Sequence, residues 1–302
     1  MFRNVFIGVD GRPAGRDAVA LAKMLGATGA RFTLVHVYGG ALMPGRPASV
    51  AFDAGARADS ERLLEAERET AAIDAELISV CAPSVGRGLH TLAETRAADL
   101  LVLGSHSRGL AGRVLVGDDT RASLNGASCA VAIAPRGYVA VVPAAGFGTV
   151  GVGYDFSAES QAALAAAREL AARDHARISA LYVVSLPSWG YMAPMPGNWG
   201  DIVEKDRKAA AERVSSLEGV DATAVYGLPG EELAAFGHRV DLLVVGSRNY
   251  GPLRRLVLGS TSDGLARHAR CPLLVLPRKA PAAEPREADR ADEVAAPIGT
   301  AS

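Results

Sequence analysis

The chain has 302 residues, of which 22% are charged and 49% are hydrophobic, and its formal net charge is −1. This length suggests two domains of ordinary size. A charge balance so close to neutral excludes a global field that would recruit nucleic acid or an anionic membrane surface. Three scattered cysteines exclude a disulfide framework or a zinc cluster and favour a cytoplasmic location. The N-terminus has only a short apolar run, so no signal peptide or membrane anchor is expected there.

In chain order, the first half alternates short Val, Ile and Leu runs with helical patterns. Residues 5–26 indicate a strand followed by a helix, and residues 56–75 indicate a long charged helix of the kind that presents a solvated face. The uncharged run at 100–103 is typical of a strand covered on both faces. Residues 137–154 are uncharged but contain Gly and Pro, so they predict two strands with a link and not a membrane span.

The second half gives the same alternation of apolar runs and helical patterns. Such βαβ alternation is the signature of a parallel, doubly wound sheet. The predicted strands lie near 150–154, 177–183, 221–226, 241–245 and 272–276, and the predicted helices near 158–173, 201–217, 229–237 and 260–269.

An internal repeat relates the two halves. "ADLLVLGS" (98–105) returns as "VDLLVVGS" (240–247), displaced by 142 residues, whereas the strand and helix at 5–26 return at 150–171, displaced by 145. We expect the three-residue difference in the loop after the second strand. The predicted fold is two tandem Rossmann-like, doubly wound α/β domains, each with a mostly parallel five-stranded sheet flanked by helices. The expected division is a first domain at 1–136, a linker at 137–149, a second domain at 150–279 and a disordered tail at 280–302.

A glycine-containing loop follows the fourth predicted strand of the second copy, in "GSRNYGPLRRLVLGSTS". Gly246 ends the strand, Asn249 tolerates a left-handed turn, and Gly259 has no Cβ to keep a phosphate from the backbone. Arg248 is close enough to the turn to meet a phosphate. Three hydroxyl residues then open a helix, where free N–H groups and the helix dipole form a phosphate seat. These are Ser260, Thr261 and Ser262; the alternative is that they only cap the helix.

This arrangement resembles the universal stress proteins in their tandem two-domain form, over about residues 3–279. ATP-binding members of that family carry Gly, two residues, Gly, nine residues, then Gly and Ser or Thr. The stretch beginning at Gly246 keeps these spacings, with Asn249 in place of the second glycine. The resemblance implies that Asp155 lies beside the adenine or ribose of ATP and that the backbone of Val183 reads the adenine edge. Without it, Asp155 is a strand-end turn residue and Val183 a core residue.

The resemblance also implies the rest of the nucleotide site. Gly246 would line the sugar and phosphate path, and Asn249 would form the turn in place of the family's second glycine, while Arg248 is either a phosphate contact or a solvated surface residue. A divalent ion, Mg²⁺, would bridge the phosphates. The phosphates themselves would be held by Gly259, Ser260, Thr261 and Ser262.

The first copy departs from this pattern. It has Ser107 where glycine is expected and Asp118 where Ser or Thr is expected. A carboxylate about 4 Å from a phosphate charge costs on the order of 4 kcal/mol at an effective dielectric constant near 20. We therefore predict a weak or vacant first site and one competent site per chain. The alternative, a metal site at Asp118 and Asp119, lacks an evident third ligand. The first copy keeps the strand-end and loop residues Asp10, Val37, Gly104 and Gly117.

Three classes of function remain open from the sequence. One is a nucleotide-dependent regulatory or stress-response module, the second a slow ATPase or adenylating enzyme, and the third a dimerisation module that binds no nucleotide. The sequence has neither a P-loop lysine motif nor a G-x-S-x-G elbow, so no catalytic residue is predicted. A Rossmann dehydrogenase is disfavoured because Phe156 stands where the third glycine of its motif belongs.

The expected partners are an adenine nucleotide and a protein that the sequence does not name, without nucleic acid or membrane insertion. The two copies are expected to pack as an internal pseudo-dimer with "CAVAIAP" (129–135) facing "CPLLVLP" (271–277), and a homodimer of the chain remains open. The segment 186–201 carries two tryptophans, and both a lid over the base and an ordinary surface loop are consistent with it.

Overall fold

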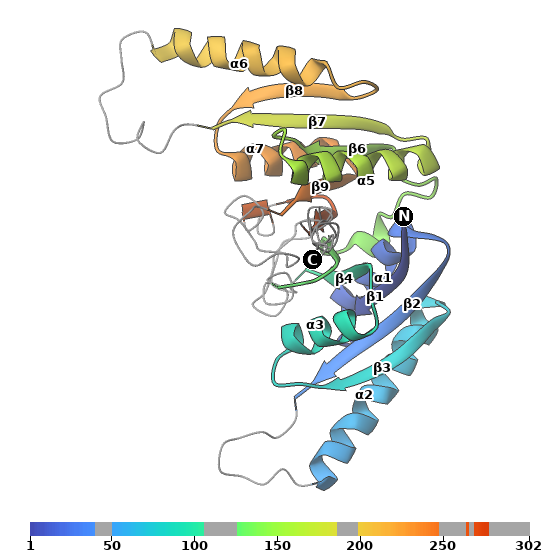
Figure 1. Ribbon diagram of the computed structural model, residues 1–302. Helices are drawn as coiled ribbons and strands as arrows, with labels where there is room; N and C mark the ends of the chain where they lie inside the picture. Colours follow the sequence, from blue (N-terminus) through green and yellow to red (C-terminus); the bar gives the residue numbers. More distant parts are fainter. Residues whose placement is uncertain (40–49, 106–125, 186–198, 248–263, 266–268, 278–302) are drawn as a thin grey trace, which may run out of the picture.

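The computed structural model describes residues 1–39, 50–105, 126–185, 199–247, 264–265 and 269–277. The strands of these residues form one ten-stranded sheet that runs through both halves of the chain, in the order β3-β2-β1-β4-β5-β10-β9-β6-β7-β8. Figure 1 shows a curved, elongated body, with α2 and β3 at one end and α6 and β8 at the other.

Each half contributes five of these strands, with helices between them. The first half contains β1 (Phe2–Gly8), α1 (Pro13–Leu25), β2 (Gly26–Tyr38), α2 (Val50–Ala71), β3 (Ala75–Cys81), α3 (Val85–Thr95), β4 (Leu100–Gly104), β5 (Ala130–Ala134) and the 3₁₀ turn η1 (Tyr138–Ala140). The second half contains β6 (Thr149–Gly153), α5 (Ala158–Asp174), β7 (Arg177–Val184), α6 (Trp199–Ser215), β8 (Asp221–Tyr226), α7 (Pro229–Phe236), η3 (Gly237–Arg239), β9 (Leu242–Gly246) and β10 (Leu273–Leu276).

The two halves meet through their last strands. All pairs within a half are parallel, whereas β5 and β10 pair antiparallel, with Ile133 opposite Leu273. The segments 129–135 and 271–277, which we expected to face one another, therefore do so through these two strands. The predicted fold class, two tandem doubly wound α/β units with mostly parallel sheets, is confirmed.

Helices cover both faces of the sheet. On one face, α1, α2 and α5 pack Leu21, Leu64 and Leu170 into a core shared with both halves. On the other face, α3 and α7 pack Leu89 and Leu233 against a second core. The strands between them, such as the buried run of β4, read as continuous apolar segments because both of their faces are covered.

Local signals in the sequence set the helix starts. The helix α1 begins with Pro13, whose missing N–H would have had no partner in the first turn. The helix α5 is capped by Ser157, whose Oγ accepts a hydrogen bond from the backbone N–H of Ser160 at 3.1 Å. Four residues separate the start of each of these helices from the end of the preceding strand, at the carboxyl edge of the sheet.

The expectation of a strand at the beginning of 137–154 was wrong. Residues 138–140 form a 3₁₀ turn, and the strand β6 starts only at Thr149. The buried carboxylate of Asp17 on α1 explains the turn, because it accepts hydrogen bonds from the backbone N–H groups of Gly137 and Val139 at 2.8 and 2.9 Å. These two N–H groups are therefore not available to hydrogen-bond with a neighbouring strand.

The predicted helix at 56–75 ends earlier than its pattern indicated. It stops at Ala71, Ala72 adopts a left-handed backbone conformation with φ of 45°, and β3 begins at Ala75. Its face is also less solvated than its charge suggested, because Ser60, Leu64 and Glu67 are buried.

The three-residue difference between the copies does not lie after the second strand. Val35 on β2 corresponds to Leu181 on β7, and Ile78 on β3 to Thr223 on β8. At the third strand the displacement between the copies is therefore still about 145 residues and has not fallen to 142. The third helix differs instead, with 11 residues in α3 and 8 in α7.

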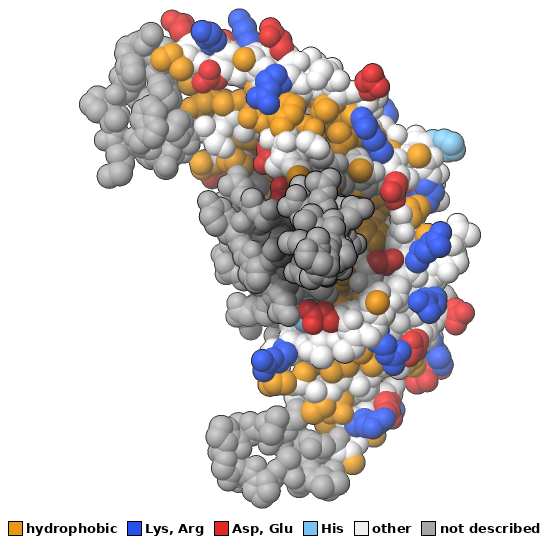
Figure 2. Space-filling view, in the orientation of Figure 1, with side chains coloured by type: hydrophobic (Ala, Val, Ile, Leu, Met, Phe, Trp, Pro, Cys, Tyr) orange, Lys and Arg blue, Asp and Glu red, His pale blue; other side chains and the backbone are white. Residues whose placement is uncertain are grey.

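Charges of both signs are interspersed over the face shown in Figure 2, along the outer surfaces of both halves. This agrees with the near-neutral net charge of the chain. Among the described helices, none combines the length and apolar character needed to cross a bilayer.

Candidate functional site

A cavity of about 540 Å³ lies in the second half, at the carboxyl edge of β6, β7 and β9. One side is apolar and includes Val183, Leu233 and Val245, and the polar part includes Asp155 and Ser247. This is the edge at which doubly wound sheets hold their ligands, and the volume suits a small molecule. The remaining described lining residues are Gly153, Tyr154, Ser157, Glu159, Ser160, Leu181, Tyr182, Val184, Ser185, Pro229 and Gly246.

The strand registers bring the key side chains to one level. Gly153 on β6 pairs with Leu181 on β7, and Val152 pairs with Val244 on β9. Asp155 follows β6 by two residues and Ser247 follows β9 directly, and both line the same cavity as Val183 near the end of β7. Adjacent strands are about 4.8 Å apart, so a ligand at this edge can touch all three residues.

Gly246 allows α5 to approach the end of β9. A Cβ at this position would lie 2.6 Å from Cβ of Glu159 and 2.7 Å from its backbone. The structure therefore brings together three of the predicted site residues, Asp155, Val183 and Gly246, around one cavity.

The carboxylate of Asp155 is held in place by the start of α5. Its Oδ1 accepts hydrogen bonds from the backbone N–H of Ser157, at 3.1 Å, and from the Ser157 hydroxyl. Within the described part of the chain no hydrogen bond or ion pair reaches Oδ2. That second oxygen is therefore available to a ligand.

Ser247 is a cavity residue that the sequence analysis did not select. It is 1% exposed, and its hydroxyl has no hydrogen-bond partner among the described residues, although its backbone N–H donates to the carbonyl of Leu276 at 3.0 Å. A buried hydroxyl without a partner is rare in proteins. The sequence carried one signal for it, because "GS" ends the fourth strand in both copies, as Gly104 and Ser105 and again as Gly246 and Ser247.

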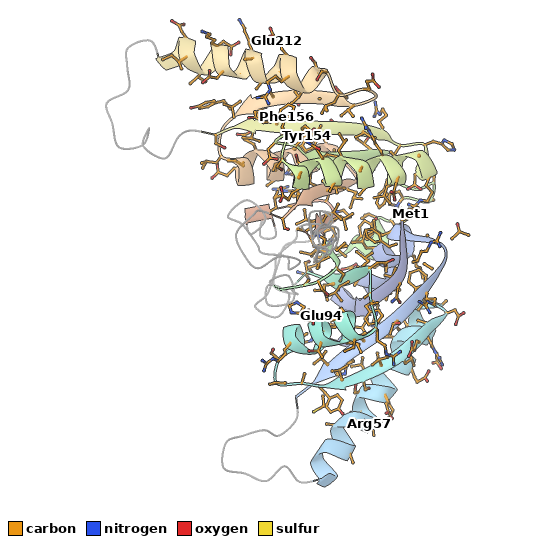
Figure 3. All side chains as sticks on the ribbon, viewed as in Figure 1. Met1, Arg57, Glu94, Tyr154, Phe156 and Glu212 are labelled. Atoms are coloured by element: carbon orange, nitrogen blue, oxygen red, sulfur yellow. The ribbon has the colours of Figure 1, made fainter. Side chains whose placement is uncertain are left out.

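An aromatic cluster borders the cavity beside Asp155. The ring of Phe156 contacts those of Tyr154 and Tyr182, with centroids 5.0 and 5.6 Å apart, and the guanidinium of Arg213 on α6 lies 4.2 Å from the Phe156 centroid. Figure 3 labels Tyr154 and Phe156 beneath α6. Phe156 holds φ of 64°, where the first half has Gly11 with φ of 74°.

The equivalent carboxylate in the first half is engaged differently. Oδ1 of Asp10 accepts from the backbone N–H of Arg12 at 3.1 Å, and a guanidinium nitrogen of Arg12 lies 3.6 Å from Oδ2. Both carboxylate oxygens of Asp10 therefore have a partner within its own loop. Arg12 corresponds to Ser157 in the second half, which carries no charge.

A polar chain replaces the aromatic cluster in the first half. Nδ1 of His36 on β2, at the place of Tyr182, lies 2.7 Å from Oγ of Ser60, which lies 2.7 Å from Oγ of Ser79. Burial lowers the pKa of His36, and the nearby Asp10 carboxylate opposes this shift. The two halves have thus diverged on this side of the sheet, where α2 and α6 cover it.

Several predicted site residues lie outside the described part of the chain. They are Arg248, Asn249, Gly259, Ser260, Thr261 and Ser262 of the second copy, and Ser107, Gly117, Asp118 and Asp119 of the first. Most of the tryptophan-containing segment, 186–198, also lies outside it. Among the residues that are described, no group of three or more His, Cys, Asp or Glu side chains is suited to hold a metal ion.

Comparisons with known proteins identify the repeat. The model of the "Universal stress protein family" matches residues 1–135 and again residues 146–277. Universal stress protein Rv2005c of Mycobacterium tuberculosis is 30% identical over 190 residues, which are 59% of this chain and 61% of that relative. The chain thus spans less than two thirds of that relative's length.

A second relative and a solved structure were also found. A universal stress protein of Thermus aquaticus is 31% identical over 144 residues, which cover 43% of this chain and 98% of that relative. The crystal structure of a universal stress protein from Archaeoglobus fulgidus shares the fold with a TM-score of 0.64 at 19% identity, covering 91% of this chain and 98% of that one. The chain therefore belongs to the universal stress protein family, as a tandem member with two copies of the family domain.

Proposed function

We propose that this protein binds an adenine nucleotide in its second half and acts as a nucleotide-dependent regulatory module of the stress-response type. The cavity at the carboxyl edge of β6, β7 and β9 carries this proposal, because Asp155, Val183 and Gly246 line it together. These are the three described residues among those selected for nucleotide binding from the sequence.

The chemistry of the cavity supports a nucleoside. The side of Val183, Leu233 and Val245 offers an apolar surface for a flat base. We propose that the backbone of Val183, near the end of β7, meets the edge of that base. The free oxygen of Asp155 accepts hydrogen bonds, which suits a sugar hydroxyl.

We propose that the phosphates extend from this cavity toward the loop that begins at Arg248. In this proposal Asn249 forms the turn, and Mg²⁺ joins the phosphates to the loop. The backbone at Gly259, Ser260, Thr261 and Ser262 would hold them, as the family resemblance implies. ATP is then the proposed ligand.

We further propose that the first half is a weak or vacant nucleotide site. Arg12 occupies the carboxylate of Asp10, which a sugar hydroxyl would need. Asp118 adds a negative charge at the phosphate position of the loop. Both features disfavour the ligand in the first copy while their counterparts in the second copy do not.

The proposed organisation follows the repeat. The first domain spans 1–136, a linker 137–149 and the second domain 150–279, with a tail at 280–302. In this proposal the antiparallel pair of β5 and β10 joins the two domains as an internal pseudo-dimer. We propose that nucleotide binding in the second domain alters the affinity of the cytoplasmic protein for a further protein partner.

The test is the mass of the small molecule that remains bound after purification under native conditions. The proposal predicts an adenine nucleotide in the wild-type protein and its loss in Asp155→Asn, with Asp10→Asn as the matched control that retains it. A wild-type protein that retains no nucleotide and also shows no heat of binding with millimolar ATP would contradict the proposal.

A further inference from the structure

The hydroxyl of Ser247 is an orphaned polar group inside the cavity. The residue is 1% exposed, it lines the cavity, and its Oγ has no hydrogen-bond partner in the part of the chain that the structure describes. Buried polar groups are almost always hydrogen-bonded, so an orphan at a ligand cavity points to a partner beyond the described residues, and a bound ligand is the partner that a cavity supplies.

The sheet directs this hydroxyl toward the nucleoside side of the cavity. Leu243 and Val245 face the core that α7 covers, and by the alternation of a strand Ser247 continues on that face. Val183 packs against the same core. Ser247 therefore lies on the side of the sheet where the proposed base lies.

Ser247 also has Asp155 as its neighbour at the same level of the sheet. The β6 and β9 register pairs Val152 with Val244, three residues before Asp155 and Ser247 respectively, and both residues line the one cavity at this edge. At the spacing of adjacent strands, about 4.8 Å, one ligand oxygen can reach both side chains.

The chemistry of this pair selects a neutral hydroxyl. The carboxylate of Asp155 only accepts hydrogen bonds, whereas the Ser247 hydroxyl both donates and accepts. A ligand hydroxyl can donate to Asp155 and accept from Ser247 at the same time. A phosphate is disfavoured here, since Asp155 and Glu159 both line the cavity and the described lining includes no Lys, Arg or His.

We propose that Ser247 and Asp155 together bind a ribose hydroxyl, and that Ser247 is a residue that makes the site select ribonucleotides over deoxyribonucleotides. This inference rests on the proposed nucleotide function. The first half offers a natural control, because Ser105 at the equivalent position is equally buried but has an interaction partner.

The experiment is a set of calorimetric titrations of the full chain with ATP, 2′-deoxyATP and 3′-deoxyATP. We expect wild-type protein to bind ATP about tenfold more tightly than at least one deoxy analogue, because that analogue leaves the pair without a partner. Ser247→Ala should bind ATP about tenfold more weakly and lose this preference. Ser105→Ala should keep both the affinity and the preference of the wild type.

Thermal unfolding of the ligand-free proteins supplies an independent readout. Ser247→Ala removes an orphaned buried hydroxyl, so its unfolding midpoint should equal or exceed that of the wild type, whereas Ser105→Ala should unfold at a lower temperature. A lower midpoint for Ser247→Ala would mean that the hydroxyl bonds to an ordered water in the free protein and would contradict the orphan assignment.

The outcomes separate this inference from the function on which it rests. A wild-type protein that binds no nucleotide overturns both. Wild-type binding with an unchanged affinity and sugar preference in Ser247→Ala overturns the Ser247 assignment alone and leaves the nucleotide site standing.

Discussion

The guanidinium of Arg213 lies over the ring of Phe156, 4.2 Å from its centroid, and ties α6 to the loop that carries Asp155. Phe156 also contacts Tyr154 and Tyr182. It makes these contacts from a left-handed backbone conformation, with φ of 64°, that costs a non-glycine residue on the order of 1–3 kcal/mol. Packing at this position therefore outweighs backbone strain.

Two substitutions at Phe156 separate packing from strain. Phe156→Ala loses the ring contacts and keeps the strain, so it should lower the free energy of unfolding by about 3 kcal/mol. Phe156→Gly loses the same contacts but relieves the strain, as Gly11 does in the first half, so it should be more stable than Phe156→Ala by about 1 kcal/mol. Urea unfolding measures both, and a glycine variant less stable than the alanine variant would show that the strain is absent.

Asp99 and Asp241 perform the same task in the two halves. Asp99 accepts from the backbone N–H groups of Arg3 and Asn4, and Asp241 from those of Gly148 and Thr149. Each carboxylate thereby fixes the start of the first strand in its half.

Removing either carboxylate should be costly. Asp99→Ala and Asp241→Ala each leave two backbone donors without their charged acceptor, so each should lower the free energy of unfolding by about 2–3 kcal/mol. Asp221→Ala, at an exposed strand start, is the control and should change it by less than about 0.5 kcal/mol. Equal denaturation midpoints for all three variants would refute this role.

The burial of Glu67 leads us to expect that the stability of the folded protein depends on pH. Its side chain on α2 is 6% exposed, no described residue hydrogen-bonds to its Oε2, and Arg16 lies 3.9 Å from Oε1. Burial raises the pKa of Glu67, Arg16 opposes this shift and Asp10 adds to it. Because the pKa is higher in the folded than in the unfolded state, the stability contributed by the protonated form is lost as the pH rises through the folded pKa.

Glu67→Gln carries no charge at any pH and should avoid that loss. We expect the variant to be more stable than the wild type at pH 7, with the difference shrinking as the pH falls through the raised folded pKa and reaching its smallest value near pH 4.5, the ordinary value for Glu. Glu69→Gln, on the exposed face of the same helix, should show no such trend. Chemical denaturation at a series of pH values tests this, and a variant less stable than the wild type at pH 7 would show that the Arg16 ion pair dominates.

The fold was predictable because both copies repeat the same patterns. The predicted strand at 221–226 is β8 to the residue, and the predicted helix at 158–173 is α5 but for one residue. These elements have apolar runs or caps that local physics determines. The boundaries that failed depend on tertiary contacts, such as the Asp17 carboxylate that draws residues 137–139 into a turn.

The site was predictable only where a motif ended a strand. Asp155, Val183 and Gly246 lie at strand ends, and the parallel sheet brings such positions together. Ser247 could not be selected in this way, because what distinguishes it is the lack of a partner for its buried hydroxyl. The sequence shows a serine in both copies, and only the structure shows that one of the two is an orphan.

The central claim is that only the second half holds a competent nucleotide site, and calorimetric titration of the full chain with ATP and Mg²⁺ tests it most directly. We predict a stoichiometry near one per chain, a binding loss of about tenfold or more in Asp155→Asn, no binding in Gly259→Asp, and unchanged binding in Asp10→Asn. A stoichiometry near two, or a loss caused by Asp10→Asn while Asp155→Asn binds normally, would contradict the account.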